Sequence, residues 1–179
     1  MAGDGTDLAT GAQRTGTGKR AKALYTAEER RRRDESRWTL VQGLLAPLQF
    51  LVFLISLALV LRYLATGLGE NAADLSIVAK TLLLYTIMIT GSIWEKVVFG
   101  RWLFAEAFFW EDVFSMLVLA LHSAYLAMLF GGIGTADQRM LVALAGYAAY
   151  VINAGQFLLK LRAARLEAPG STLAAATAA

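Results

Sequence analysis

The sequence predicts an all-α protein: an integral membrane bundle of four helices whose N- and C-termini are both cytoplasmic. Hydrophobic residues make up 57% of the 179 residues and the mean hydropathy is +0.51, which is too apolar for an ordinary soluble domain. Four apolar segments each approach the roughly 20 residues that a helix needs to cross a bilayer. Lysine and arginine side chains gather at one set of span ends, which predicts the orientation.

The two ends of the chain differ from the middle. Residues 1–24 are rich in Gly, Thr and Ala, and residues 167–179 are of low complexity, so both are expected to be disordered tails. Residues 25–38 form a strongly charged interfacial segment. Within it, Thr26 and Glu29 have the spacing of a capping box, which predicts a short helix lying at the membrane surface.

The transmembrane domain is expected at residues 39–166. Its four spans are predicted at about 39–64, 76–94, 108–130 and 139–161. Backbone polar groups in lipid must be satisfied within each segment, so closely spaced spans should form one helical bundle. Basic residues lie before the first span, in the loop at 95–107 and after the fourth span, and these regions are therefore expected to face the cytoplasm.

Composition excludes several kinds of chemistry. The chain has no cysteine and one histidine, which excludes thiolate zinc sites, iron–sulfur clusters and multi-histidine metal sites. The formal charge of +3 arises entirely in residues 1–37, and the remainder carries eight charges of each sign. A nucleic acid is therefore not an expected partner.

Polar side chains follow one face of three spans. They are interpreted either as a seam of hydrogen bonds between helices or as the wall of a ligand-lined cavity, and the sequence leaves both open. Pro47 predicts a kink in the first span close to this face. The polar residues are Gln42, Gln49, Ser56 and Tyr63 in the first span, Thr81, Tyr85, Ser92 and Glu95 in the second, and Asn153, Gln156 and Lys160 in the fourth.

Ionisable residues in the third span are the most unusual feature. Glu111 and Asp112 lie about one turn inside the boundary, and His122 lies eleven residues later, about 16 Å deeper and on the same face as Glu111. For ionisable groups inside a membrane span, the default hypothesis is a functional role. The alternatives are a hydrogen-bonded core histidine and helix N-terminal acids paired with Lys96 or Arg101. Lys80, in the second span, is expected to snorkel outward.

Four carboxylates surround the loop at 95–107, which contains only two cations. Crowding beside an apolar interior should keep a proton on at least one carboxyl group near neutral pH, as a general acid requires. The carboxylates are Glu95, Glu106, Glu111 and Asp112, and the cations are Lys96 and Arg101.

Three long stretches are recognisable as a family pattern. They are LYTAEERRRRDESRWTLVQGLLAPLQFLVFLISLALVLRYLATG, SIWEKVVFGRWLFAEAFFWEDVFSMLVLALHSAY and YVINAGQFLLKLRAARL, and together they lie within residues 24–166. In them the chain resembles the 3-vinyl bacteriochlorophyllide hydratases of anoxygenic phototrophic bacteria, also called chlorophyllide hydratases.

The resemblance implies a hydro-lyase of bacteriochlorophyll biosynthesis. Such an enzyme adds water across the C3 vinyl group of chlorophyllide a or a related magnesium tetrapyrrole and forms a 1-hydroxyethyl group. The expected location is the bacterial inner membrane, cytoplasmic or intracytoplasmic, and no cofactor is expected. The fourth span permits a homo-oligomer without requiring one, and association with other pigment-biosynthesis enzymes is a further expectation.

The implied chemistry assigns a hypothetical role to each residue. One carboxyl group protonates the terminal vinyl carbon, and a neighbouring carboxylate stabilises the resulting cation and orients water. His122 ligates the magnesium of the substrate or relays protons, and Lys96 or Arg101 holds the propionate. The catalytic candidates are Glu95, Glu111, Asp112 and His122, and the substrate-binding candidates are Lys96, Arg101, Gln49, Asn153, Gln156 and Tyr85.

Two other classes of function remain open from the sequence. A pigment carrier or assembly factor without catalytic activity would have the same apolar helices and the same histidine. A small four-helix transporter is the weaker alternative, because the two halves show no inverted repeat.

Overall fold

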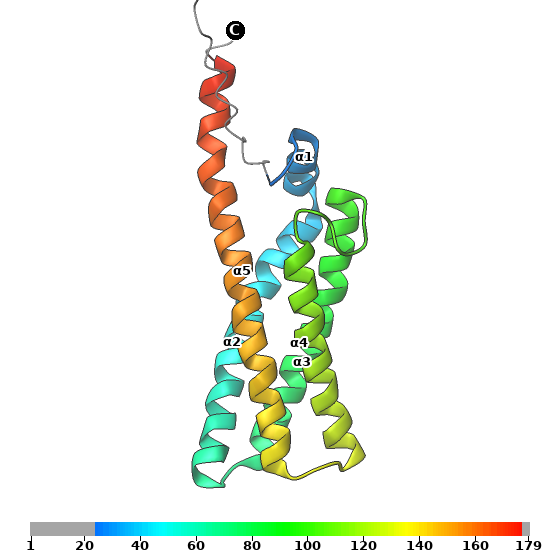
Figure 1. Ribbon diagram of the computed structural model, residues 1–179, viewed down its shortest axis with the longest axis vertical. Coiled ribbons are helices and arrows are strands. Elements are labelled where there is room, and N and C mark those ends of the chain that lie inside the picture. Colours follow the sequence, from blue (N-terminus) through cyan, green and yellow to red (C-terminus); the bar gives the residue numbers. More distant parts are fainter. Residues whose placement is uncertain (1–23, 177–179) are drawn as a thin grey trace, which may run out of the picture.

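The computed structural model describes residues 24–176, with side chains described up to Ala163. This part of the chain consists of helices and loops. The helices are α1 (Ala27–Glu35), α2 (Arg37–Thr66), α3 (Glu70–Phe99), α4 (Phe109–Gly131) and α5 (Ala136–Ala176). Helices α2 to α5 run side by side along the long axis, and α1 lies at one end of them (Figure 1). The predicted all-α fold is confirmed.

Four helices are long and apolar enough to cross a membrane: α2, α3, α4 and Ala136–Ala163 of α5. The second span is longer than predicted, because α3 extends beyond the apolar window at both ends, from Glu70 to Phe99. Helix α5 reaches Ala176 and so enters the segment predicted as a C-terminal tail. The N-terminal tail predicted at residues 1–24 lies almost wholly outside the described residues, and the orientation of the termini stays a prediction.

The helix ends follow local rules of sequence. The capping box is confirmed: the Glu29 backbone N–H donates to Thr26 Oγ1 at 3.2 Å, and the Thr26 N–H donates to a Glu29 carboxylate oxygen at 2.7 Å. Ser36 then caps α2 by accepting from the Trp38 N–H. A glycine with positive φ ends each of α2, α3 and α4, a conformation that glycine adopts without steric cost. These glycines are Gly67, Gly100 and Gly132.

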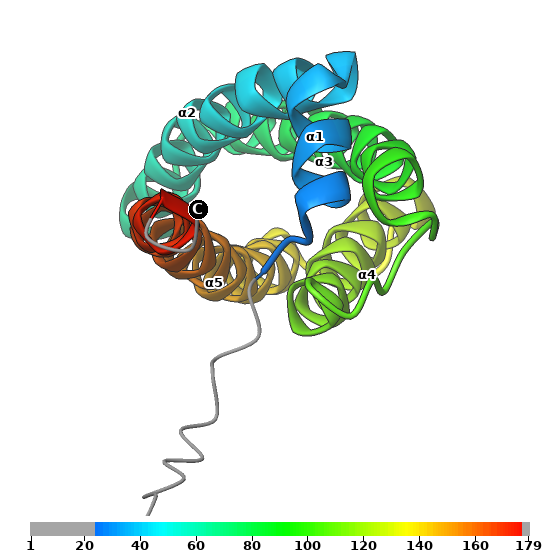
Figure 2. The same cartoon turned by 90° about the horizontal axis from the view of Figure 1, so that it is seen from above.

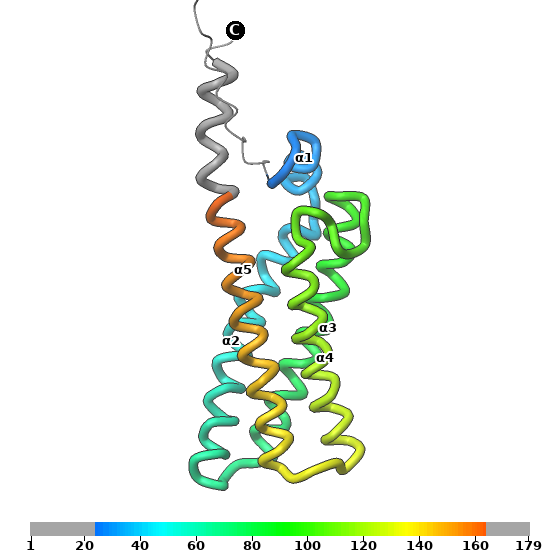
Figure 3. Tube along the Cα trace, viewed as in Figure 1, coloured from blue at the N-terminus to red at the C-terminus, as the bar shows by residue number. Residues whose placement is uncertain are grey.

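The bundle is built from two helical hairpins. Helix α2 packs mainly along α3 and α4 mainly along α5, whereas contacts of α2 with α5 and of α3 with α4 are fewer. From above, the four helices form a ring, and α1 crosses over it (Figure 2). The α3–α4 loop lies at the same end as α1, which we call the α1 end. The α2–α3 and α4–α5 loops lie at the other, the hairpin end (Figure 3).

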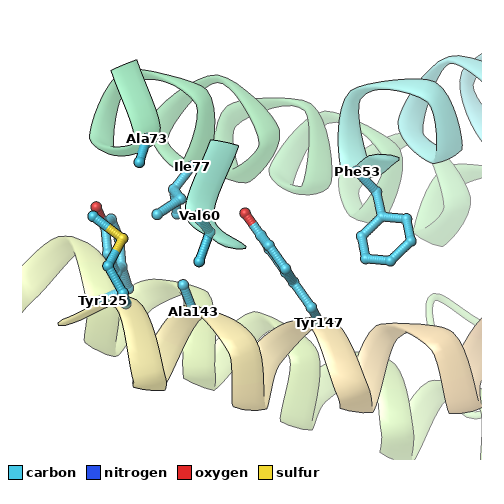
Figure 4. Close-up of a cluster of buried hydrophobic side chains, with 8 residues drawn as sticks. Phe53, Val60, Ala73, Ile77, Tyr125, Ala143 and Tyr147 are labelled. Carbon is cyan, nitrogen blue, oxygen red and sulfur yellow. The ribbon is translucent and has the colours of Figure 1, made fainter. Parts of the chain in front are cut away.

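A hydrophobic cluster fills the half of the bundle toward the hairpin end. Its side chains come from all four long helices and face one another across the interior (Figure 4). Burial of such apolar area supplies most of the stability of the packing. The cluster consists of Phe53, Val60, Ala73, Ile77, Tyr125, Met140, Ala143 and Tyr147.

A second cluster, which is aromatic, anchors the segment before α1. Tyr25 stacks on Phe99 with ring centroids 5.7 Å apart, and Phe108 packs against both rings. The Arg33 guanidinium of α1 lies 4.8 Å from the centre of the Tyr25 ring. Burial raises the pKa of the Tyr25 phenol, so this hydroxyl stays neutral. Helix α1 itself buries no residue, so these contacts position it across the end of the bundle.

Polar side chains join the helices within the interior. Ser56 of α2 bonds to Ser76 of α3 at 2.7 Å and to the Tyr147 hydroxyl of α5 at 2.5 Å. Toward the hairpin end, Arg139 pairs with Asp74 at 3.4 Å, and the Tyr125 hydroxyl donates to Asp74. Buried polar groups in low-dielectric surroundings need such partners, so these contacts align the helices along their axes.

Lys80 does not snorkel outward, so that prediction was wrong. Its side chain is fully buried, and its Nζ lies 3.0 Å from His122 Nε2 and 4.5 Å from the centre of the Tyr150 ring. The reason is its helical phase. Lys80 lies three residues after Ile77 and four before Leu84, and both are buried, so the lysine is on the inward face of α3.

A close contact between α4 and α5 depends on glycine. A Cβ at Gly146 would lie 2.8 Å from His122 Cε1 and 2.9 Å from His122 Nδ1, whereas a Cβ at Gly155 would meet nothing within 4 Å. The small residue therefore makes room for the imidazole ring.

We expect Gly146→Ala to destabilise the protein by about 1–3 kcal/mol, because the new methyl group overpacks the contact with His122. The matched change Gly155→Ala, in the same helix, should stabilise it by about 0.5–1 kcal/mol through helix propensity. Thermal unfolding in one detergent measures both. Equal melting temperatures for the two variants would contradict the close packing at Gly146.

Candidate active site

Two buried carboxyl groups meet at the α1 end of the bundle. Glu95 comes from the last turns of α3 and Asp112 from the first turn of α4, and their carboxyl groups accept hydrogen bonds from the backbone amides of two consecutive residues. Both residues are about 95% buried, with relative exposures of 5% and 4%. Two neighbouring buried carboxyl groups repel each other when both are ionised, which favours a proton on one of them. Such a pair is suited to donate a proton.

The loop between α3 and α4 is folded around this acid pair. The Phe104 N–H donates to Asp112 Oδ2 at 2.7 Å, and the next N–H, that of Ala105, donates to Glu95 Oε2 at 3.2 Å. Phe104 has φ +57°, and it is the only non-glycine residue with positive φ in the part of the chain that the structure describes. This unusual backbone lets consecutive amides hold both acids, as in an anion-binding nest.

Glu111 has a partner that the sequence does not predict. Lys160 of α5 lies 2.6 Å from Glu111 Oε2, donates also to the Ala107 carbonyl, and lies 5.1 Å from the centre of the Phe108 ring. The alternative in which Glu111 pairs with Lys96 or Arg101 is therefore not the arrangement found: its cation is Lys160. The reason is that α5 packs along α4 and brings Lys160 to the first turn of α4.

Lys96 and Arg101 lie at the surface. Lys96 donates to the Gly100 carbonyl at 3.0 Å, and its Nζ lies 5.9 Å from the centre of the Trp102 ring. Arg101 lines an open depression of about 680 Å³ between the start of α1 and the α3–α4 loop. Glu106 also lines this depression and is exposed, unlike the acid pair. A charged substituent of a ligand can reach this region without entering the bundle.

The polar stripe of the first span combines the two interpretations that the sequence left open. Gln42 donates to Thr90 of α3 at 2.7 Å, and Ser56 bonds to Tyr147, so these positions form an interhelical seam. Gln49, between them, is 1% exposed, and its amide nitrogen and oxygen both lack a partner. That position has the property expected of a ligand-facing group.

Two amides on α5 share this property. Asn153 is 8% exposed and donates from Nδ2 to Ser115 Oγ at 2.8 Å, but its Oδ1 has no partner. The Oε1 of Gln156, one turn closer to the acid pair, is also buried and unpartnered. Tyr85 differs, because its hydroxyl bonds to Ser123 at 2.8 Å and therefore joins α3 to α4.

His122 lies apart from the acid pair, deeper in the bundle. Its Nδ1 is 2.8 Å from the Val118 carbonyl and its Nε2 is 3.0 Å from Lys80 Nζ. The carbonyl requires a proton on Nδ1, so Nε2 is the acceptor and the ring is neutral. Both nitrogens are thus in use, as in the alternative of a hydrogen-bonded core histidine. The described residues contain no group of three His, Cys, Asp or Glu side chains that would hold a metal ion.

Several contacts of the candidate site were not predicted from the sequence. Lys160 was placed on a polar stripe but was not paired with Glu111, and Ser115 was placed on the face of Glu111 but was not linked to Asn153. Helical spacing predicts the face of the helix on which a residue lies, but it does not predict the axial position of that residue relative to another helix. The amides of Phe104 and Ala105 have no sequence signal, because every residue type except proline has a backbone N–H.

Comparison with known proteins identifies the family. The model of the family "2-vinyl bacteriochlorophyllide hydratase (BCHF)" matches residues 25–163. The chain is 68% identical over 147 residues to the 2-vinyl bacteriochlorophyllide hydratase of Rhodobacter capsulatus, which covers 82% of this chain and 85% of that protein. The chain belongs to this family. The hydratase of the same name from Cereibacter sphaeroides is 69% identical over 146 residues, covering 82% of this chain and 91% of its own. No solved structure matches the chain.

The family match covers the whole candidate site. Residues 25–163 begin at the aromatic anchor of α1 and include the acid pair, the α3–α4 loop and the amides of α2 and α5. The resemblance to the vinyl hydratases that the sequence showed is confirmed, although the family name numbers the vinyl position as 2 rather than 3.

We expect Lys160→Met to destabilise the protein by about 2–4 kcal/mol, because it leaves the largely buried Glu111 carboxylate without its cation. The double variant Lys160→Met/Glu111→Gln should recover most of that loss, since no unpaired charge remains. The free energies of unfolding for this double-mutant cycle are measured by titration with a denaturing detergent, with circular dichroism as the signal. Additive effects of the two changes would show that the ion pair contributes nothing.

Proposed function

We propose that this chain is a hydratase of bacteriochlorophyll biosynthesis that adds water to the vinyl group of a chlorophyllide or bacteriochlorophyllide in a bacterial photosynthetic membrane. The names of the relatives support the reaction. The observation that supports the site assignment is the buried pair of Glu95 and Asp112, held by the amides of Phe104 and Ala105, and in this proposal the pair shares one proton. Acid-catalysed hydration of an alkene needs such a proton donor in water-poor surroundings.

The first step is protonation of carbon. The π electrons of the vinyl group take the shared proton from the acid pair, a C–H bond forms at the terminal carbon, and the positive charge appears on the carbon next to the ring. Conjugation with the macrocycle spreads this charge. The acid pair is left as two carboxylates, whose negative charge stabilises the cation.

The second step is capture by water. A water oxygen bonds to the cationic carbon, and one of its protons passes to Glu95 or Asp112, which restores the shared proton. The product is the 1-hydroxyethyl compound, and the atoms balance without a redox cofactor. In this scheme the amides of Phe104 and Ala105 hold the two carboxyl groups in place through both steps.

Glu111 has a different role in this proposal. It forms an ion pair with Lys160, and in this scheme its carboxylate contributes negative charge near the developing cation. The pigment lies with its polar groups toward Gln49, Asn153 and Gln156, each of which has a buried amide oxygen without a partner. Its propionate lies at the α1 end, where Arg101 lines the surface depression.

Turnover by the purified protein tests the function directly. The protein in detergent is incubated with chlorophyllide a and water alone, and the product is followed by the absorbance change on loss of the vinyl group and by a mass gain of one water. A carrier or assembly factor would return the vinyl compound unchanged, and that result would overturn the proposal.

Substitution of the acid pair tests the site. Glu95→Gln and Asp112→Asn should each lower the turnover number about 10²–10⁴-fold, the usual contribution of a positioned acid. Glu111→Gln should have a smaller effect, because Glu111 does not donate the proton. Glu35→Gln, at an exposed carboxylate on α1, is the isosteric control and should leave turnover unchanged. Near-normal activity of both acid-pair variants would exclude this site.

A further inference from the structure

Three buried amide groups in the bundle have unused oxygen atoms. They are Gln49 Oε1, Asn153 Oδ1 and Gln156 Oε1, and Gln49 Nε2 is unused as well. Polar atoms inside proteins nearly always have a partner, because an unpaired buried polar group is strongly destabilising. Ser56 and Lys80, two other buried polar side chains, have partners. The remaining buried atom without a partner among the described residues, Arg139 Nε, lies toward the hairpin end, so the unpartnered amide atoms are all on the α1 side of the hydrophobic cluster.

The amides of α2 and α5 lie at facing positions. The rings of Phe53 on α2 and Tyr150 on α5 pack with centroids 5.0 Å apart. Gln49 lies one helical turn from Phe53 toward the α1 end, and Asn153 lies one turn from Tyr150 in the same direction, because the two helices are antiparallel. A ligand between them would contact both amides and would rest on the aromatic pair.

The orientation of Asn153 is set by its neighbour. Its Nδ2 donates to Ser115 Oγ of α4 at 2.8 Å, which leaves Oδ1 as the free end of the amide. An outer hydrogen bond of this kind is typical of side chains that coordinate metals, because it fixes the ligand atom in place. The free atom is a neutral oxygen acceptor inside an apolar bundle.

We infer that Asn153 Oδ1 binds the central magnesium of the tetrapyrrole substrate as its axial ligand. Gln49, on the facing helix, contacts the same pigment. This inference rests on the proposed function for the identity of the pigment. Magnesium prefers oxygen ligands, and an amide carbonyl satisfies it without adding a charge to the interior. His122, the other candidate, already accepts a hydrogen bond from Lys80 at Nε2.

The position suits the reaction at the acid pair. Ser115, the partner of Asn153, lies three residues after Asp112 on α4, a rise of about 4.5 Å. A macrocycle centred at Asn153 therefore extends to the level of the acid pair at its edge, where the vinyl group is attached. The magnesium contact would set how far the vinyl carbon lies from the shared proton.

Paired pigments test the inference. Purified protein is titrated with chlorophyllide a and with its magnesium-free counterpart, pheophorbide a, and binding is followed by fluorescence quenching. The wild-type protein should bind the magnesium pigment at least about tenfold more tightly. Asn153→Leu should lose this preference by weakening only the magnesium pigment, and Asn153→Asp, which keeps an oxygen, should retain it.

Two serines of α4 provide a matched control. Ser115→Ala removes the bond that orients Asn153 and should weaken the magnesium pigment about tenfold. Ser123→Ala removes a bond of the same kind, to Tyr85, and should leave the preference unchanged. The absorption bands of the bound pigment, which respond to axial ligation, should shift in Asn153→Leu and not in Ser123→Ala.

Two results would overturn the inference: a magnesium preference that survives in Asn153→Leu, or an equal loss of affinity for both pigments, which indicates a packing contact only. If Asn153→Leu does not fold, an unchanged magnesium preference in Ser115→Ala overturns it. A wild-type protein that shows the Asn153-dependent preference but does not hydrate chlorophyllide would instead refute the proposed function and leave the ligation intact.

Discussion

The structure depends on one constraint: a polar side chain inside four apolar helices must find its partner inside the bundle. Ser56 with Tyr147, Lys80 with His122 and Asp74 with Arg139 each join different helices. Because losing a partner in these surroundings is costly, each pair permits only a narrow range of relative helix positions. The apolar side chains fill the space between these pairs, but apolar packing restricts the relative axial positions of the helices less than a hydrogen bond does.

Two buried polar side chains do not satisfy this constraint. Gln49 and Asn153 are as deeply buried as the paired residues, yet they carry unused polar atoms. They lie in the half of the bundle that contains the acid pair, whereas the hydrophobic cluster and the network around Arg139 occupy the other half. The bundle is therefore divided along its axis into a half that contains the hydrophobic cluster and a half that contains the acid pair and the unpartnered amide oxygens.

The acid pair links packing to chemistry. Glu95 and Asp112 come from different helices, and the amides of Phe104 and Ala105 turn the intervening loop toward them. The positive φ of Phe104 is unfavourable by itself, and the two hydrogen bonds to carboxyl groups offset it. Lys160 neutralises Glu111 beside this pair, so three neighbouring acids exist in different environments. In the proposed mechanism, these differences separate the proton donor from the charge that stabilises the cation.

The sequence by itself determined the four spans, the capping box at Thr26 and the inward polar face of α2, because these follow from hydropathy, local capping and helical periodicity. It also placed Glu95, Glu111 and Asp112 near one end of the bundle. Only the tertiary structure decided that Lys160 pairs with Glu111, that Lys80 points inward to His122, and that Gln49 has no partner while Gln42 has one. Those outcomes depend on the axial register between helices distant in sequence, which packing of the whole bundle sets and no local pattern encodes.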